Sequence, residues 1–195
     1  MIGFRRVTFA LLLAVMAIAC VHAQNRTPVG QQASPITPPP ATKLEGFKPA
    51  AGSVVTMCYD DLGSVGGISV DVREMRDTKG AAVRGLVVDI TESEYRQERS
   101  FVDADEVGEL LKGFDALLEV KANPTQFKNF EVRYTTRGEL QLTAFSSSNG
   151  SILYAVQTGR TLKAQKLGLS AATMQKLRAL FFAASQKIAT LGPIR

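Results

Sequence analysis

The sequence predicts an α+β domain in which antiparallel sheets pack against two amphipathic helices. Three observations lead to this prediction. Several short segments alternate apolar and polar residues, two longer segments repeat apolar residues at helical spacing, and turn signals separate them. The order is strands, helix, strands, helix over residues 53–191. A stretch of roughly 140 residues is a common size for a single domain with one core.

Four strands are expected before the first helix. Each is rich in apolar and β-branched residues, and together they are expected at residues 54–59, 68–73, 83–91 and 95–102. Gly63, Gly66 and Gly67 lie between the first two strands. A glycine-rich loop can bind phosphate, but the phosphate-loop pattern is absent here. A flexible hairpin connection is therefore expected.

The first helix is expected to begin at Asp103. The Asp103 side chain is placed to cap it, and Glu106 stands where a capping box needs it. Apolar residues then recur at helical spacing as far as Leu118. Asn123 and Pro124 end this unit.

The second half repeats the order. Strands are expected at residues 130–134, 140–145, 152–156 and 161–167. Ser170 is placed to cap a second helix whose apolar face extends to Ile188, and Gly192-Pro193 ends it.

The two halves also share a short sequence likeness. Asp71-Val72-Arg73 and Glu131-Val132-Arg133 are each followed by a turn containing a basic residue and glycine. A likeness over three residues can arise by chance, so duplication stays an open alternative. The order of four strands, helix, four strands, helix resembles the Whirly and PUR-type folds, which bind single-stranded nucleic acid. This resemblance lies in element order alone, since no motif of either family is matched.

An export signal is expected at the N-terminus. Two arginines precede an uncharged and almost entirely apolar run, residues 7–20, which is shorter than the roughly 20 residues that span a bilayer. Val21-His22-Ala23 has the form of a cleavage site, so residues 1–23 are predicted to be a signal peptide and the protein to be secreted or periplasmic. The alternative is a lipoprotein: Cys20 follows small residues, and its lipidation would anchor the chain to a membrane.

Residues 24–52 are predicted to be a disordered linker. They contain six of the eight prolines and show almost no apolar periodicity. The formal net charge of the whole chain is +5, and it falls to +3 without residues 1–23, which carry two arginines and no acid. Acidic and basic residues are scattered through the rest, which favours a mixed, solvated surface.

Composition excludes several kinds of active site. His22 and Cys20 both lie in the predicted signal peptide, so the mature chain has no histidine and only Cys58 as a thiol. A Ser-His-Asp or Cys-His pair and a histidine-ligated metal are therefore ruled out. No metal or cofactor is expected. Cys58 lies in a strand pattern and is predicted to be a small buried residue.

Two groups of side chains offer other chemistry. The first is a set of acids that could do general acid-base work or hold a divalent cation: Asp60, Asp61, Asp103, Asp105 and Glu106. The four aspartates among them could supply the carboxylate pair of a hydrolase. The second consists of polar, basic and aromatic residues that could bind single-stranded nucleic acid: Arg133, Tyr134, Thr135, Arg137, Gln141, Thr143, Phe145, Tyr154 and Arg160. Acids are also common in the first turn of a helix, and some of the aromatics fall on the core-facing parity of their strands. The structural interpretation of both groups is favoured.

We therefore expect a small, non-catalytic exported domain that binds a partner from the end of a proline-rich tether. A protein, a glycan or an envelope component would suit this description. Two alternatives remain at this point: a module that binds single-stranded nucleic acid, and a carboxylate-dependent hydrolase.

Overall fold

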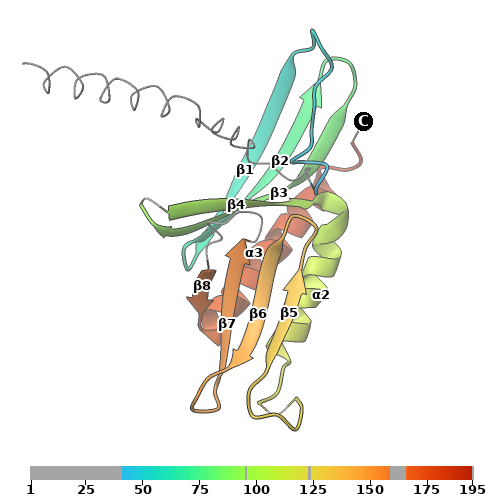
Figure 1. Ribbon diagram of the computed structural model, residues 1–195. Helices are drawn as coiled ribbons and strands as arrows, with labels where there is room; N and C mark the ends of the chain where they lie inside the picture. The colour runs from blue at the N-terminus through green and yellow to red at the C-terminus, as the bar shows by residue number, and fades with distance from the viewer. Residues whose placement is uncertain (1–40, 95, 123, 159–165, 195) are drawn as a thin grey trace, which may run out of the picture. The chain divides into compact units, whose positions relative to one another are not determined.

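Two antiparallel sheets and two α-helices make up the computed structural model, which describes residues 41–94, 96–122, 124–158 and 166–194 (Figure 1). The chain divides into residues 1–38 and residues 39–195, and every described residue belongs to the second unit. The arrangement confirms the predicted α+β fold. The predicted signal peptide and most of the predicted linker lie outside the described residues. No helix in the described ranges is long and apolar enough to span a membrane.

Each sheet has four strands that follow one another in sequence order. Sheet A contains β1 (Val55–Val65), β2 (Ile68–Asp77), β3 (Ala82–Ser93) and β4 (Arg96–Asp103). Sheet B contains β5 (Glu131–Thr135), β6 (Leu140–Ser146), β7 (Ile152–Thr158) and β8 (Lys166–Leu169). A short 3-10 turn, η1 (Ala104–Glu106), leads into α2 (Val107–Leu118), and α3 (Ala171–Thr190) ends the fold. The predicted strand at 161–167 falls largely outside the described residues.

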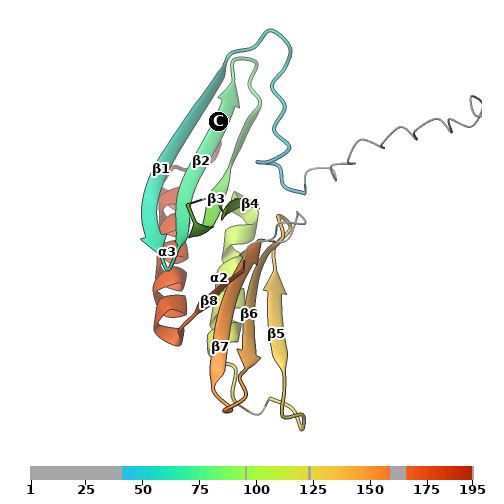
Figure 2. The ribbon, with the colours of Figure 1, turned by 60° about the vertical axis from the view of Figure 1, so that its left-hand side comes forward.

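Each helix packs against the sheet of the other half. Helix α2 follows sheet A in sequence but packs on β5 and β6, whereas α3 follows sheet B and packs on β1 and β2 (Figure 2). The two helices also contact each other. One shared core results, in which Val70 and Leu86 of sheet A, Leu142 of sheet B, Phe114 of α2 and Phe181 of α3 are all fully buried.

The first helix does not begin with the predicted capping box. Both carboxylate oxygens of Asp103 accept hydrogen bonds from the backbone N–H groups of Lys43 and Leu44, at 2.9 and 3.0 Å. Glu106 instead accepts from the backbone N–H of Arg137 at 2.7 Å. The capping prediction was wrong because a distant segment takes the oxygens. By contrast, Ser170 does cap α3, since its hydroxyl accepts from the N–H of Thr173.

Residues 41–52, which we expected in the linker, form part of the folded unit. Leu44 is only 1 % exposed. Asp77 at the end of β2 accepts a hydrogen bond from the backbone N–H of Ala50 at 3.0 Å. The folded unit therefore begins before residue 53.

The glycines between β1 and β2 form a tight turn. Gly66 and Gly67 have φ values of +61° and +83°, which suit a two-residue hairpin connection of type I′. A Cβ atom at Gly66 would lie 2.8 Å from the methyl group of Thr173 at the start of α3. The hairpin is thus docked on the helix, and it forms no phosphate-binding loop.

Candidate functional site

The first half of β1 is exposed, although it lies in a regular strand. All of its side chains from Val55 to Tyr59 are exposed, and the neighbouring Val54 is exposed as well. Tyr59 has 72 % and Met57 has 52 % of its surface accessible. Large apolar side chains usually avoid such exposure when they lie together. We call residues 54–59 the β1 edge.

For Thr56 and Cys58, which lie on the side of sheet A that faces α3, the exposure follows from where this helix ends. The helix stops at Thr190 and covers the helix-facing side of sheet A only as far as its middle. Beyond this point, charged residues replace apolar ones on the helix-facing side of the sheet, and apolar residues appear on the outer face. Glu74 and Arg84 are opposite each other on the helix-facing side, where Val72 and Leu86 stood one pair earlier.

On the outer face, away from α3, apolar side chains lie next to one another on neighbouring strands. Met75 of β2 is opposite Val83 of β3, and Met57 of β1 is opposite Met75. Since side chains alternate between faces along a strand, Val55, Met57 and Tyr59 all lie on this outer face. The sheet therefore presents an apolar strip that continues to its edge.

The β1 edge also lacks the features that usually protect a sheet edge. Strand β1 stands at the end of the strand order, with β2 as its only neighbour among the described strands. Residues 54–59 contain no charge and no proline, and the only irregularity in the pairing comes later, between Asp61 and Ser64. The edge strand β5 is shorter and carries Glu131 and Arg133. Charges, bulges and short length are the usual defences against unwanted pairing.

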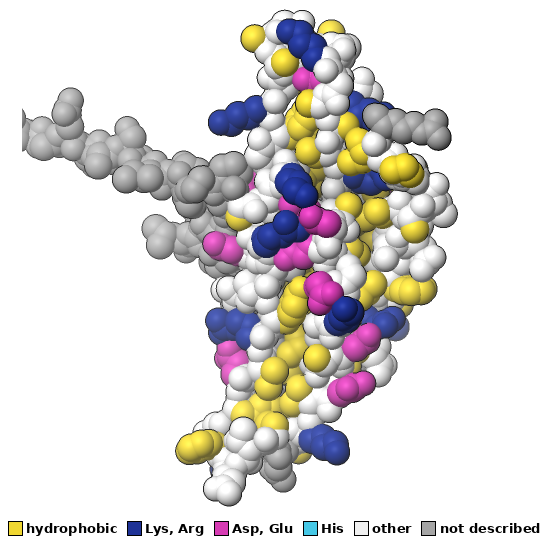
Figure 3. Space-filling model, turned by 90° about the vertical axis from the view of Figure 1, so that its right-hand side faces the viewer, with side chains coloured by type: hydrophobic (Ala, Val, Ile, Leu, Met, Phe, Trp, Pro, Cys, Tyr) yellow, Lys and Arg dark blue, Asp and Glu magenta, His cyan; other side chains and the backbone are white. Residues whose placement is uncertain are grey.

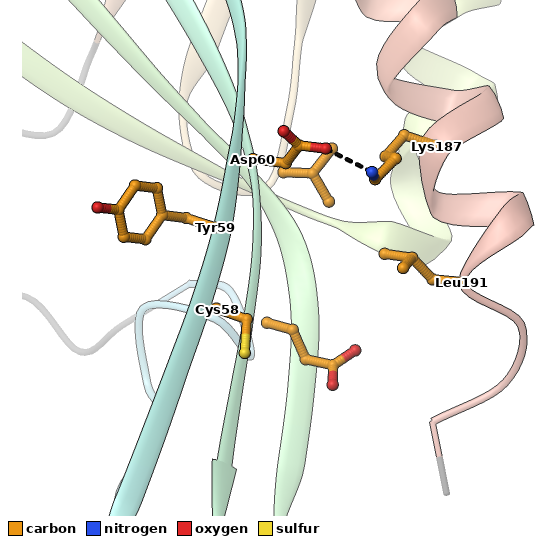
Figure 4. Close-up of a pocket in the computed structure, with 7 residues that line it drawn as sticks. Cys58, Tyr59, Asp60, Lys187 and Leu191 are labelled. Atoms are coloured by element: carbon orange, nitrogen blue, oxygen red, sulfur yellow. Dashed lines mark ion pairs between the residues drawn. The ribbon is translucent and has the colours of Figure 1, made fainter.

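A cavity of about 320 Å³ lies between β1 and the end of α3 (Figure 4). It is lined by Cys58, Tyr59, Asp60, Val72, Glu74, Lys187 and Leu191. The Asp60 carboxylate lies 2.5 Å from the Lys187 ammonium, whereas the Tyr59 ring points away from the helix. Burial desolvates Glu74, but hydrogen bonds from Arg76 and Arg84 lower the pKa of its carboxyl group below the usual value.

Cys58 is exposed, so the prediction of a buried thiol was wrong. The strand pattern around it is real, but α3 ends too early to cover this position. The structure places no second cysteine near it among the described residues.

The acids at the end of β4 form a structural junction. Asp103 accepts the two backbone hydrogen bonds described above, and Asp105 pairs with Lys43 at 2.8 Å and with Arg137. Hydrogen bonds from Lys43 and Arg137 lower the pKa of Asp105. Asp103 and Asp105 line one cavity of about 310 Å³, but both carboxylates are engaged in these hydrogen bonds and ion pairs within the domain.

The other acid pair is separated by the strand itself. Asp60 and Asp61 are consecutive in β1 and therefore point to opposite faces. Asp60 pairs with Lys187, and Asp61 accepts a hydrogen bond from the N–H of Gly63 at 2.7 Å. Within the described ranges, no group of three acids, cysteines or histidines is arranged to hold a metal ion.

The aromatic residues considered for nucleic-acid binding lie mostly in the core. Tyr154 is 5 % exposed, and the Tyr134 ring packs on α2, where a Cβ atom at Gly113 would approach it to 2.6 Å. Arg133 pairs with Glu131, and Arg137 is held in the acidic junction. Arg160 lies outside the described residues. Acidic and basic side chains are interspersed on the face shown in Figure 3.

The β1 edge is not apparent from the sequence. Its six consecutive uncharged residues were recognised as a strand, but strand patterns do not reveal which part of a sheet stays uncovered. The useful signal was the alternation in β2, where apolar residues change faces between Val72 and Met75.

Comparison of the chain with models of known protein families, with curated proteins and with solved structures finds no match.

Proposed function

We propose that this chain is an exported, non-catalytic interaction domain that binds an extended segment of protein at the β1 edge. One observation carries the proposal: a long strand at the border of sheet A combines exposed apolar side chains with a run free of charge and proline. An extended segment added to such an edge gains backbone hydrogen bonds, and alternate side chains provide specificity.

Three features of the β1 edge support protein as the ligand class. Backbone N–H and C=O groups along a sheet edge pair with the regularly spaced peptide groups of another strand, and glycans and nucleic acids have no peptide backbone. The exposed side chains Val55, Met57 and Tyr59 are spaced at every second residue, as are the side chains of an added strand. Methionine and tyrosine are also enriched at protein interfaces. The acids and arginines at the acidic junction and on β5 are engaged in ion pairs within the domain, as is Asp60.

Export is part of the proposal and rests on the sequence of residues 1–23. Mass spectrometry of the mature protein should find Gln24 as the first residue. A lipid-modified Cys20 would instead give a membrane-anchored form, and an intact Met1 would contradict export through cleavage.

The binding surface can be tested by site-specific photo-crosslinking in the producing cells. A photoreactive phenylalanine analogue replaces Tyr59 at the β1 edge, and Thr135 on β5 serves as the matched control, because it is also exposed on an edge strand. We expect one discrete protein adduct from position 59 that is lost when Met57→Lys is added. The absence of adducts from position 59, or identical adducts from both positions, would contradict the proposal.

A further inference from the structure

We propose that the partner at the β1 edge is a second copy of this chain, paired antiparallel through the same strand. This inference rests on the proposed function and names the partner of that surface. Pairing would join two four-stranded sheets into one continuous sheet. Self-complementary surfaces of this kind produce two-fold symmetric dimers.

The alternation of β1 limits the register that such a dimer can adopt. Val55, Met57 and Tyr59 lie on the outer face, and Thr56 and Cys58 lie on the helix-facing side. In an antiparallel pair, residues directly opposite each other share a face of the sheet. A two-fold axis perpendicular to the sheet therefore has to lie midway between the two copies of one β1 residue, so that this residue is opposite itself. We name each axis by that residue.

An axis through Met57 gives the most favourable set of opposing residues. It places Val55 opposite Tyr59 of the partner subunit and Thr56 opposite Cys58 of the partner subunit. Aromatic and β-branched residues form stabilising cross-strand pairs. An axis through Cys58 would set Val55 against the partner's Asp61, and an axis through Asp60 would set two identical carboxylates against each other, which is destabilising.

With the axis at Met57, Ser53 lies opposite Asp61 of the partner subunit. Ser53 is close to the turn between β2 and β3, where its hydroxyl lies 3.5 Å from the Asp77 carboxylate and the Lys79 ammonium bonds to the carbonyl oxygen of Ala51 at 2.7 Å. Asp61 of the partner subunit would therefore lie near both an acid and a base, and the register rests on the apolar pairs rather than on charge.

The N-terminal segment of the same chain is a poorer occupant. Residues 24–40 contain five prolines. Proline has no backbone N–H group and cannot donate to a strand ladder. A second β1 strand, by contrast, has no proline from Ser53 to Asp61, and every second backbone N–H group in β1 points away from β2.

Disulfide trapping tests the register. Met57→Cys is introduced together with Cys58→Ser in the chain from Gln24 onward, and Val55→Cys in the same background is the matched control. Opposing residues of antiparallel strands are about 4.5 to 5.5 Å apart at Cα, within the range that a disulfide spans. Under mild oxidation, we expect covalent dimers from position 57 and few or none from position 55. Equal yields from both positions would overturn the register.

Sedimentation tests the association itself. Between roughly 1 μM and 1 mM, we expect the average mass of the unmodified chain to rise from monomer toward dimer. Met57→Lys puts two ammonium groups side by side at the axis and should weaken association about tenfold or more. Thr135→Lys, an exposed change on β5, should leave association unchanged. A chain that stays monomeric at every concentration overturns the self-pairing.

The two proposals can fail separately. If the chain is monomeric and the photoreactive group at position 59 captures a different protein, self-pairing is wrong and the β1 edge remains a binding surface. If the chain is monomeric and position 59 captures nothing, both proposals are wrong.

Discussion

The ring of Phe114 on α2 lies 5.2 Å from the ring of Phe181 on α3, with an angle of 41° between their planes. Both side chains are fully buried. Because each helix packs on the sheet of the other half, this contact lies where both halves meet. It ties together the two sheets that form the shared core.

Replacement of Phe114 by alanine should lower the free energy of unfolding by about 3 to 5 kcal/mol, as is usual for a fully buried phenylalanine. Phe182→Ala provides the control on the neighbouring position, since 47 % of Phe182 is exposed and its ring lies 5.9 Å from the Arg178 guanidinium. We expect a loss below about 1 kcal/mol for the control. Urea denaturation followed by circular dichroism measures both. Equal losses would contradict the central place of Phe114.

Asp103→Ala should loosen residues 41–46 from the domain. The change leaves the N–H groups of Lys43 and Leu44 without their acceptor, at a cost of about 1 to 3 kcal/mol for the buried donor. Asp105→Ala is the matched control, because its ion pair with Lys43 is exposed and contributes less than about 1 kcal/mol. Hydrogen exchange should show faster exchange at residues 43 and 44 only in the first variant. Unchanged exchange there would argue against the anchoring role.

Two glycines of α2 should respond to alanine in opposite directions. A Cβ atom at Gly113 would lie 2.6 Å from the Tyr134 ring, so Gly113→Ala forces the helix and β5 apart and destabilises the fold. A Cβ atom at Gly108 meets nothing within 4 Å, and Gly108→Ala should stabilise the helix by up to about 1 kcal/mol. Thermal unfolding distinguishes the two variants. A stabilising Gly113→Ala would contradict the packing described for Tyr134.

The fold should lose stability in acid. Hydrogen bonds from the backbone N–H groups of Ala50, Ala81 and Lys79 lower the pKa of Asp77, and those from Lys43 and Arg137 lower that of Asp105. A carboxyl group with a lowered pKa in the folded state binds protons more readily when unfolded. Its contribution is present above the unfolded pKa of about 4 and is lost as the pH falls through the folded value.

The urea concentration at the denaturation midpoint, measured from pH 7 to pH 2, should therefore decrease once the pH is below about 5. Asp105→Asn should make this decrease shallower. A pH dependence identical to that of the unmodified chain would show that the Asp105 ion pairs contribute nothing to acid stability.

Asp71 should behave in the opposite way. Burial raises the pKa of its carboxyl group, with Asp61 and Asp89 adding repulsion and Arg73 opposing the shift. A raised pKa favours folding below the unfolded pKa, and this contribution is lost as the pH rises through the folded value. Asp71→Asn should consequently stabilise the protein at pH 7 and have little effect near pH 3. Destabilisation at pH 7 would mean that the contact with Arg73 outweighs burial.

The fold was largely predictable because its signals are local. Alternation along β2 and β3 and helical spacing in α2 and α3 depend only on neighbouring residues, and Ser170 caps its own helix. The capping prediction at Asp103 failed because the decisive partners, Lys43 and Leu44, lie about sixty positions away in the chain. Such a contact leaves no periodic trace in the sequence.

The candidate site was harder to predict for a related reason. Cys58 has the neighbours of a buried strand residue, and its exposure depends on the position of the last turn of α3 relative to sheet A. The end of that helix was expected at Gly192-Pro193, but its length along the sheet surface follows only from the three-dimensional packing.

Because each helix packs on the sheet of the other half, sheet A cannot complete its packing as soon as it is synthesised. Helix α3 is the last element, and it covers the sheet that is made first. When the chain leaves the ribosome N-terminus first, β1 and β2 lack this cover until α3 is free. A product truncated before Ala171 therefore leaves the apolar surface of sheet A open to aggregation or to chaperones.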